Sequence, residues 1–190
     1  ELYYGYTNGT PELRQRVLDI YDQNLSLDNV LITSGSAEAN FLSIMTQLDA
    51  GDEIIYMVPN YLQIFHLARS LGIIVKTLPL RHELGWQWDT DELKKLVSSK
   101  TKMIVVCNPN NPTGAIMHDE IMDQVITIAE ENDCWILSDE VYRGAELKGE
   151  ECRSFAFSTE KTIVNAGLSK AYSLPGLRIG WTIGSKTYIN

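Results

Sequence analysis

Lys170 is the side chain of this sequence best suited to covalent chemistry. It lies between two short apolar runs, Thr162–Ala166 and Leu177–Ile183, and the pair Pro175-Gly176 marks a turn before the second run. Because an unpaired ammonium group is costly to bury, a lysine between two buried strands must either reach solvent or serve chemistry. Taken alone, the pattern favours a solvent-reaching side chain, so the chemical alternative depends on the residues that precede it.

Asp139 follows another apolar run, which begins at Cys134. A carboxylate at the end of a buried strand needs a cation or hydrogen-bond donors, because it is otherwise expensive to remove from water. A protonated ring nitrogen of a cofactor would be one such partner. A capping role in a turn is the alternative.

The segment Ser34–Ala37, which contains Gly35 and Ser36, joins an apolar run to a helical pattern. Free amides at a helix N-terminus attract anions, and glycine lets a phosphate group approach the backbone closely. An ordinary strand-to-helix turn capped by Ser36 is the simpler interpretation of the segment on its own.

Two more candidates follow predicted strands. The ring of Tyr61 could stack on a flat cofactor ring, although a core or surface aromatic fits the sequence equally well. Asn111 lies in the segment Asn108–Gly114, where asparagine and proline enforce a rigid turn. Turn formation alone already accounts for Pro109 and Asn110.

Short apolar strands alternate with helical patterns along most of the chain. After a Thr10-Pro11 start signal, a helix is predicted over residues 11–24. Strands that are apolar on both faces and separated by helices form a mainly parallel sheet covered on both sides, so the predicted fold is a three-layer α/β domain. Ligands bind at the carboxyl ends of such strands, where the residues above converge. The predicted strands are Val30–Thr33, Glu53–Val58, Ile73–Leu78, Met103–Cys107, Trp135–Ser138, Thr162–Ala166 and Leu177–Ile183; the predicted helices after the first are Ser36–Leu48, Leu62–Leu71, Asp91–Ser98 and Asp119–Asn132.

The composition argues against several classes of protein. The 190 residues suit one domain, and 44% hydrophobic with 22% charged residues indicates a soluble globular protein. A net charge of −9 argues against nucleic-acid binding. The sequence shows no apolar run long enough for a membrane span and no secretory signal. The start at Glu1, without a methionine, suggests that an N-terminal portion is missing.

Cysteines and histidines point to a cytoplasmic protein without a metal site. Of the three cysteines, Cys107 and Cys134 lie in apolar runs and are predicted to be reduced core residues. His66, His82 and His118 are scattered, and no His/Cys spacing predicts a metal site.

Three segments in order carry a resemblance to a known family. They are Asn108-Pro109-Asn110-Asn111-Pro112-Thr113-Gly114, Ser138-Asp139-Glu140-Val141-Tyr142, and Ser169-Lys170 followed by Arg178-Ile179-Gly180. Together they resemble the class I/II aminotransferases, which are fold-type I pyridoxal-phosphate enzymes. Complete enzymes of this family are longer, so the resemblance implies that residues 25–190 are a truncated cofactor-binding large domain, preceded by an N-terminal segment and helix (residues 1–24).

The resemblance implies a role for each candidate residue. Lys170 would form the Schiff base with pyridoxal 5′-phosphate and then move a proton between the substrate Cα and the cofactor. Asp139 would keep the pyridine nitrogen protonated. The phosphate would be held by Gly35, Ser36, Ala37 and Arg178, with Ser169 as a further contributor; Asn111 and Tyr142 would donate to the 3′ oxygen, and Tyr61 would stack on the ring.

Three further expectations come from the resemblance alone. The strand Leu177–Ile183 would run antiparallel to the rest of the sheet, which would be mixed and seven-stranded. Tyr4 would reach the phosphate of a neighbouring subunit, so the protein would be a homodimer with shared active sites. Gly167 is a departure, because many family members carry a phosphate-binding serine there.

The sequence therefore predicts an aminotransferase that moves an amino group between an amino acid and a 2-oxo acid. A carbon–sulfur β-lyase or a synthase on the same fold is an alternative, because the cofactor site is common to these enzymes. Others are the cofactor-sensing domain of a transcription regulator and a non-catalytic homologue. The arginine expected to bind the substrate carboxylate would lie in the smaller domain, so the sequence does not identify the amino acid.

Overall fold

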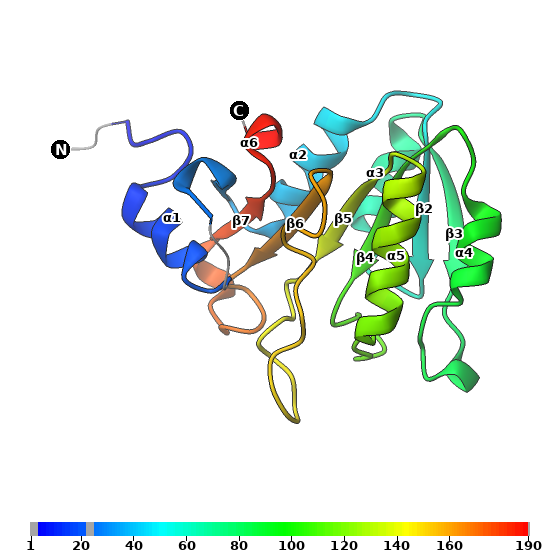
Figure 1. Ribbon diagram of the computed structural model, residues 1–190. Coiled ribbons are helices and arrows are strands. Elements are labelled where there is room, and N and C mark those ends of the chain that lie inside the picture. Colours follow the sequence, from blue (N-terminus) through cyan, green and yellow to red (C-terminus); the bar gives the residue numbers. More distant parts are fainter. Residues whose placement is uncertain (1–3, 22–24, 190) are drawn as a thin grey trace.

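The computed structural model describes residues 4–21 and 25–189, and its centre is one mixed β-sheet (Figure 1). Within these residues seven strands are paired in the order β1-β7-β6-β5-β4-β2-β3. Strand β7 is antiparallel to both of its neighbours, and the other neighbouring pairs are parallel. The predicted three-layer fold and its single reversed strand are therefore confirmed. The strands are β1 (Val30–Thr33), β2 (Glu53–Val58), β3 (Ile74–Pro79), β4 (Thr101–Cys107), β5 (Trp135–Asp139), β6 (Thr162–Gly167) and β7 (Gly180–Ile183).

Helices cover both faces of this sheet. In Figure 1, α4 and α5 lie in front of the sheet and α2 and α3 behind it. Alternate residues of one strand enter the two layers: Ile104 packs in the core beneath α4 and α5, whereas Met103 and Val105 pack beneath α2 and α3. This two-sided burial explains why the strands read as continuous apolar runs. The helices are α1 (Pro11–Leu18), α2 (Ser36–Gln47), α3 (Gln63–Ser70), α4 (Thr90–Leu96), α5 (Asp119–Glu131) and α6 (Lys186–Ile189).

Two predicted elements, the first helix and the last strand, are shorter than expected by three residues or more. Helix α1 ends at Leu18, not at residue 24, and residues 22–24 lie outside the described residues. After Leu18 the chain makes a turn over residues 19 and 20, and the Tyr21 ring that follows is buried, with its hydroxyl accepting a hydrogen bond from Trp181 Nε1 at 3.0 Å. Strand β7 begins at Gly180, not at Leu177, because Arg178 is left-handed with φ 51°, which a strand does not accommodate.

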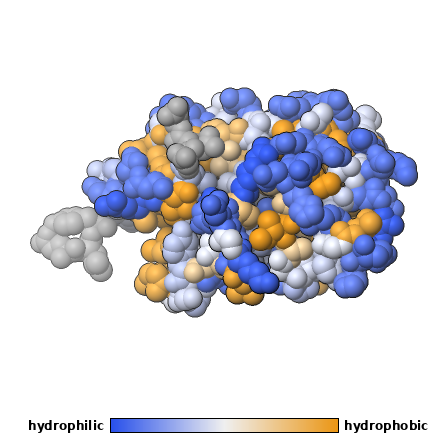
Figure 2. Space-filling model, turned by 60° about the horizontal axis from the view of Figure 1, so that its bottom comes forward, coloured by the Kyte–Doolittle hydropathy of each residue, from blue (hydrophilic) through white to orange (hydrophobic). Residues whose placement is uncertain are grey.

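The carboxyl ends of β4, β5 and β6 lie at one edge of the sheet, together with the turn that leaves β1. Figure 2 brings the lower side of the molecule forward, and polar and apolar side chains are interspersed over it. The longest connection at this edge, residues 140–161, joins β5 to β6 and projects downward in Figure 1. No helix in the described part of the chain is long and apolar enough to cross a membrane.

Candidate active site

A cleft of about 310 Å³ opens at this edge and brings most of the predicted residues together. Its walls come from five separate parts of the chain: the start of α2, the turn after β2 with the start of α3, the end of β4 and the turn after it, the end of β5 and the turn after it, and the β6–β7 connection. Residues 140 or more positions apart in sequence therefore share one surface. The predicted residues that line the cleft are Ser36, Ala37, Tyr61, Asn111, Asp139, Tyr142, Ser169, Lys170 and Arg178.

The N-terminus of α2 and Arg178 form a cradle suited to an anion. Gly35 is the cap residue of α2, has φ 86° and offers no side chain to the helix amides. A Cβ atom at Gly35 would lie 2.5 Å from Arg178 Nη2, so only glycine allows the guanidinium group to come this close. Arg178 is itself held by a hydrogen bond from Nη1 to the Pro175 carbonyl at 2.9 Å. Helix amides and a guanidinium group are the donors that a phosphate group needs.

Asp139 closes the inner end of the cleft. Its Oδ2 atom accepts a hydrogen bond from Asn40 Nδ2 at 3.0 Å, and its Oδ1 atom accepts one from the Val141 amide at 3.2 Å. Burial raises the pKa of this carboxyl group above its usual value, and the two hydrogen bonds act in the opposite direction. Among the ion pairs of residues 4–21 and 25–189, none involves Asp139. A cationic ligand group in the cleft would therefore find a carboxylate that is not already ion-paired.

Lys170 follows the end of β6 in a turn, and its side chain is exposed toward the cleft. The Nζ atom lies 6.0 Å from the centre of the Tyr142 ring, close enough for a cation–π contact. The turn is fixed by backbone hydrogen bonds from Ser173 to the Lys170 carbonyl (3.0 Å) and from Leu174 to the Leu168 carbonyl (2.9 Å). Lys170 therefore combines a defined backbone with a side chain that remains free to move within the cleft.

Asn111 lines the cleft, and the hydrogen bonds that fix the turn are made by the neighbouring asparagines. Asn108 Oδ1 accepts a hydrogen bond from the Met117 amide at 2.9 Å, and Asn110 Oδ1 accepts one from the Thr113 hydroxyl at 2.6 Å. Both of these asparagines are buried. The segment thus uses two asparagines to build the turn and leaves Asn111 to present its amide to a ligand.

The comparisons with known proteins agree with this geometry. Residues 2–190 match the family model described as Aminotransferase class I and II. The chain belongs to this family.

Curated relatives within the family are aspartate aminotransferases of about twice this length. The probable aspartate aminotransferase of Methanocaldococcus jannaschii is 33% identical, over 94% of this chain and 48% of the relative. The aspartate aminotransferase of Pyrococcus horikoshii is 32% identical, over 98% of this chain and 49% of the relative. The chain therefore spans about half the length of the curated relatives it matches.

Solved structures of aminotransferases share the whole fold of this chain. A pyridoxal-phosphate-dependent aminotransferase from Streptococcus suis superposes with a TM-score of 0.93 at 35% identity, over 100% of this chain and 50% of that chain. Aspartate aminotransferase from Thermus thermophilus with maleate also gives 0.93, at 29% identity over 98% of this chain and 50% of that chain.

Close backbone packing accounts for the glycine that departs from the aminotransferase pattern. A Cβ atom at Gly167 would lie 3.0 Å from the Ile179 carbonyl oxygen and 3.1 Å from the Gly180 Cα atom. A Cβ atom at Gly180 would in turn lie 2.4 Å from the Ser36 amide nitrogen. The end of β6, the start of β7 and the α2 turn therefore meet backbone to backbone, which leaves little room for a serine at position 167.

Two predicted residues do not line the cleft, and several cleft residues were not predicted. Gly35 borders the cleft as the cap residue of α2. Tyr4 does not line the cleft, and its side chain is fully exposed. The prediction that it reaches a second subunit is untested by a single chain. The unpredicted cleft residues are Asn40, Gln63, Cys107, Val141 and Pro175. No motif marks Asn40, because an asparagine inside a helical pattern ordinarily reads as a surface residue.

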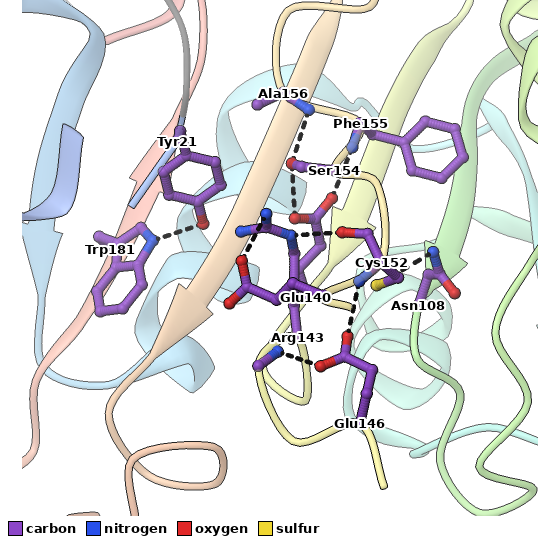
Figure 3. Close-up of polar contacts among 12 residues, drawn as sticks. Tyr21, Asn108, Glu140, Arg143, Glu146, Cys152, Ser154, Phe155, Ala156 and Trp181 are labelled. Carbon is purple, nitrogen blue, oxygen red and sulfur yellow. Dashed lines mark hydrogen bonds and ion pairs between the residues drawn. The ribbon is translucent and has the colours of Figure 1, made fainter. Parts of the chain in front are cut away.

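The long β5–β6 connection is ordered by a second buried acid, Glu140 (Figure 3). Its carboxylate accepts hydrogen bonds from the Phe155 amide at 2.8 Å, from the Ser154 hydroxyl at 2.7 Å and from Ser138 Oγ at 3.1 Å. Arg143 spans the same connection, since its Nε atom donates to the Cys152 carbonyl at 2.8 Å. Glu140 therefore holds the wall behind Asp139 in place.

Cysteines and candidate metal ligands add no second chemistry to the cleft. Cys107, Cys134 and Cys152 are all buried and unpaired. Burial is the main cause that raises the pKa of each thiol, so these thiols are poor nucleophiles. Within the described residues, no group of three or more His, Cys, Asp or Glu side chains could hold a metal ion.

Proposed function

We propose that the protein carrying this chain is a pyridoxal-phosphate-dependent aminotransferase that transfers an amino group between an amino acid and a 2-oxo acid. The observation that carries the proposal is the convergence, in one cleft, of an exposed lysine, a half-buried carboxylate that makes no ion pair and an amide-and-arginine cradle. Each is matched to a different part of the cofactor: its aldehyde, its ring nitrogen and its phosphate.

The residues present fit the cofactor by the chemistry of their donors and acceptors. The Gly35 turn and Arg178 supply donors for the phosphate. Asp139 is an acceptor in a desolvated position, so it would hold a proton on the ring nitrogen. Asn111 and Tyr142 can donate to the ring oxygen beside the aldehyde, and the half-exposed Tyr61 ring is placed to cover the cofactor ring. When bound, pyridoxal phosphate supplies the aldehyde that takes up the amino group and the ring that stores electrons.

Lys170 has two roles in this proposal. Its Nζ atom would hold the cofactor covalently through the cofactor aldehyde. Once a substrate amine had displaced it, the freed Lys170 amine would take the proton from the substrate Cα and deliver it to C4′ of the cofactor. A lysine in a fixed turn with a free side chain suits this sequence of tasks, because the amine must move while its attachment point stays in place.

The relatives support an amino-acid substrate. They are named as aspartate and aspartate/prephenate aminotransferases, which favours transfer over elimination. A homodimer with shared sites, in which Tyr4 reaches the neighbouring cofactor, and a cytoplasmic location complete the proposal.

Reductive labelling tests the proposal directly. Treatment of the full-length protein and pyridoxal phosphate with borohydride should fix the cofactor on Lys170, as located by peptide mapping. Lys170→Arg should abolish the label, whereas Lys161→Arg, which alters an ion-paired lysine outside the cleft lining, should not. Release of 2-oxo acid from an amino acid with conversion of the cofactor to its amine form supports transfer. A label on another lysine, or pyruvate and ammonia as products, would contradict the proposal.

A further inference from the structure

A buried polar group behind Asp139 lies within an otherwise apolar layer. Asn40 and Ser43 on α2 and Asn165 on β6 are buried among the core residues beneath α2 and α3, such as Ile44 and Ile163. Burying three polar side chains in an apolar core is costly unless they are hydrogen-bonded. The side-chain contacts of this group add nothing to the sheet's backbone pairing, so their cost calls for a separate explanation.

One line of contacts in this group leads through Asn40 to Asp139, and another leads to Ser43, whose Oγ atom donates to the Ala39 carbonyl at 2.8 Å. Asn165 Nδ2 donates to Asn40 Oδ1 at 2.9 Å and to Ser43 Oγ at 3.0 Å. Asn40 Nδ2 in turn donates to Asp139 Oδ2 at 3.0 Å. Asp139 and Asn165 are also paired residues of the neighbouring strands β5 and β6. The side chains of Asn40, Asp139 and Asn165 therefore lie next to one another.

The order of donors and acceptors fixes the direction of the Asn40 amide. Because Asn165 presents a hydrogen atom to Asn40 Oδ1, the nitrogen end of Asn40 must face the carboxylate. Reversal of the Asn40 amide would place its oxygen against Asp139 and two NH₂ groups against each other. Asn165 therefore selects the one orientation of Asn40 that donates to Asp139.

This arrangement is not optimised for stability. The Asn165 Oδ1 atom is buried and has no hydrogen-bond partner among the described residues. An unsatisfied buried acceptor costs stability, so a core selected only for packing would favour an apolar residue here. The retained cost indicates a function for the donor direction.

We propose that Asn40 is a positioning residue that holds the Asp139 carboxylate ionised and oriented toward the ring nitrogen of the cofactor, and that Asn165 sets the direction of Asn40. The inference rests on the proposed function, because it assumes that pyridoxal phosphate occupies the cleft. Asn40 holds Oδ2 and the Val141 amide holds Oδ1, so rotation of the carboxylate is restrained at both oxygens. A hydrogen bond donated to the ionised form also favours that form over the protonated one.

The test compares two cofactors that differ only at the ring nitrogen. Dissociation constants are measured in the full-length protein for pyridoxal phosphate and for its deaza analogue, in which a CH group replaces the nitrogen. The wild type should prefer pyridoxal phosphate. In Asn40→Leu this preference should fall about tenfold or more, the effect of losing one hydrogen bond to a charged group, while affinity for the analogue is retained.

Two additional variants separate positioning from folding. In Asn40→Leu/Asn165→Leu both amide partners become apolar in an apolar layer, so the protein should fold and show the same reduced preference as the single variant. Ile44→Val perturbs the packing of the same helix without touching the group, so it should leave the preference at the wild-type value.

Each outcome bears on one proposal only. If Asn40→Leu weakens both cofactors by the same factor, the residue is merely structural and the inference is overturned. If borohydride labels Lys170 in the wild type but no variant alters the preference, the positioning role fails while the proposed function stands. If the wild type takes up no label at Lys170, it is the proposed function that fails.

Discussion

Asp139 and Glu140 are neighbours in the chain and are both removed from water, yet they meet opposite surroundings. Glu140 accepts three hydrogen bonds from the chain and feels the nearby charge of Arg143. Asp139 accepts two hydrogen bonds and faces the cleft. Burial is the first cause that raises both pKa values, to about 7 for Glu140. The protein's own donors satisfy the Glu140 carboxylate, whereas the Asp139 carboxylate remains accessible to a ligand in the cleft.

The comparison contrasts a folding role for Glu140 with the proposed catalytic role of Asp139 at the adjacent position. Two of the three donors to Glu140, the Ser154 hydroxyl and the Phe155 amide, come from the connection after β5, so these contacts order a wall of the site (Figure 3). Asp139 has no cationic partner in the protein and can therefore bind a cationic ligand group. An unpaired carboxylate of this kind lowers stability and is typical of functional sites. Substitutions at the two positions should therefore have opposite signatures in activity and in stability.

The largest expected effect is on catalysis by Asp139→Ala. The proton-transfer rate should fall by about 10³-fold, because the charge that opposes the ring nitrogen is lost in a water-excluded position. The free energy of unfolding without cofactor should change by less than about 1 kcal/mol, since two lost hydrogen bonds are offset by relief of desolvation. Single-turnover kinetics and urea unfolding measure the two quantities. Near-normal rates in this variant would contradict the proposed role of Asp139 at the ring nitrogen.

The next effect concerns Glu140 and pH. A folded-state pKa of about 7 against 4.5 in the unfolded chain means that the folded protein binds a proton throughout this interval. The stabilisation is complete below pH 4.5 and is lost as the pH rises through 7, a total of about 3 kcal/mol. Glu140→Gln keeps the shape of the side chain and removes the titration.

The difference between wild type and Glu140→Gln isolates this group from every other one, Asp139 included. The free energy of unfolding of the wild type, relative to the variant, should fall as the pH rises from 5 to 8. Transaminase activity should be retained in the variant, because Glu140 does not line the cleft. Parallel stability curves for the two proteins would show that Glu140 does not titrate in this range.

The smallest effect is expected at Arg143, which links the Glu140 side of the site to the far end of the connection. Arg143→Met should lower the free energy of unfolding by about 1–2 kcal/mol, because its half-buried guanidinium group donates to the Cys152 carbonyl and pairs with Glu151 at 2.9 Å. Arg153→Met removes a more exposed ion pair with Asp123 and should cost less than about 0.5 kcal/mol. Equal losses in the two variants would show that the connection is not anchored at Arg143.

Local patterns were sufficient for the elements and for most of the cleft. Strands apolar on both faces indicated a covered parallel sheet, and residues placed directly after strands indicated one shared edge. This reasoning located Asp139, Lys170 and the Gly35 turn, which the structure places in or beside one cleft. Helix α6 was not predicted, because four residues carry too little periodicity.

The sequence by itself determined which residue types stand at strand ends, because hydrophobic period and turn chemistry are local properties. Only the tertiary structure decided the strand order, in which β2 lies between β3 and β4, and the left-handed turn that brings Arg178 onto Gly35. It also decided the contacts of Asn40, whose partners Asp139 and Asn165 are 99 and 125 positions away. Such contacts depend on how separate elements pack, and no spacing within one element specifies them.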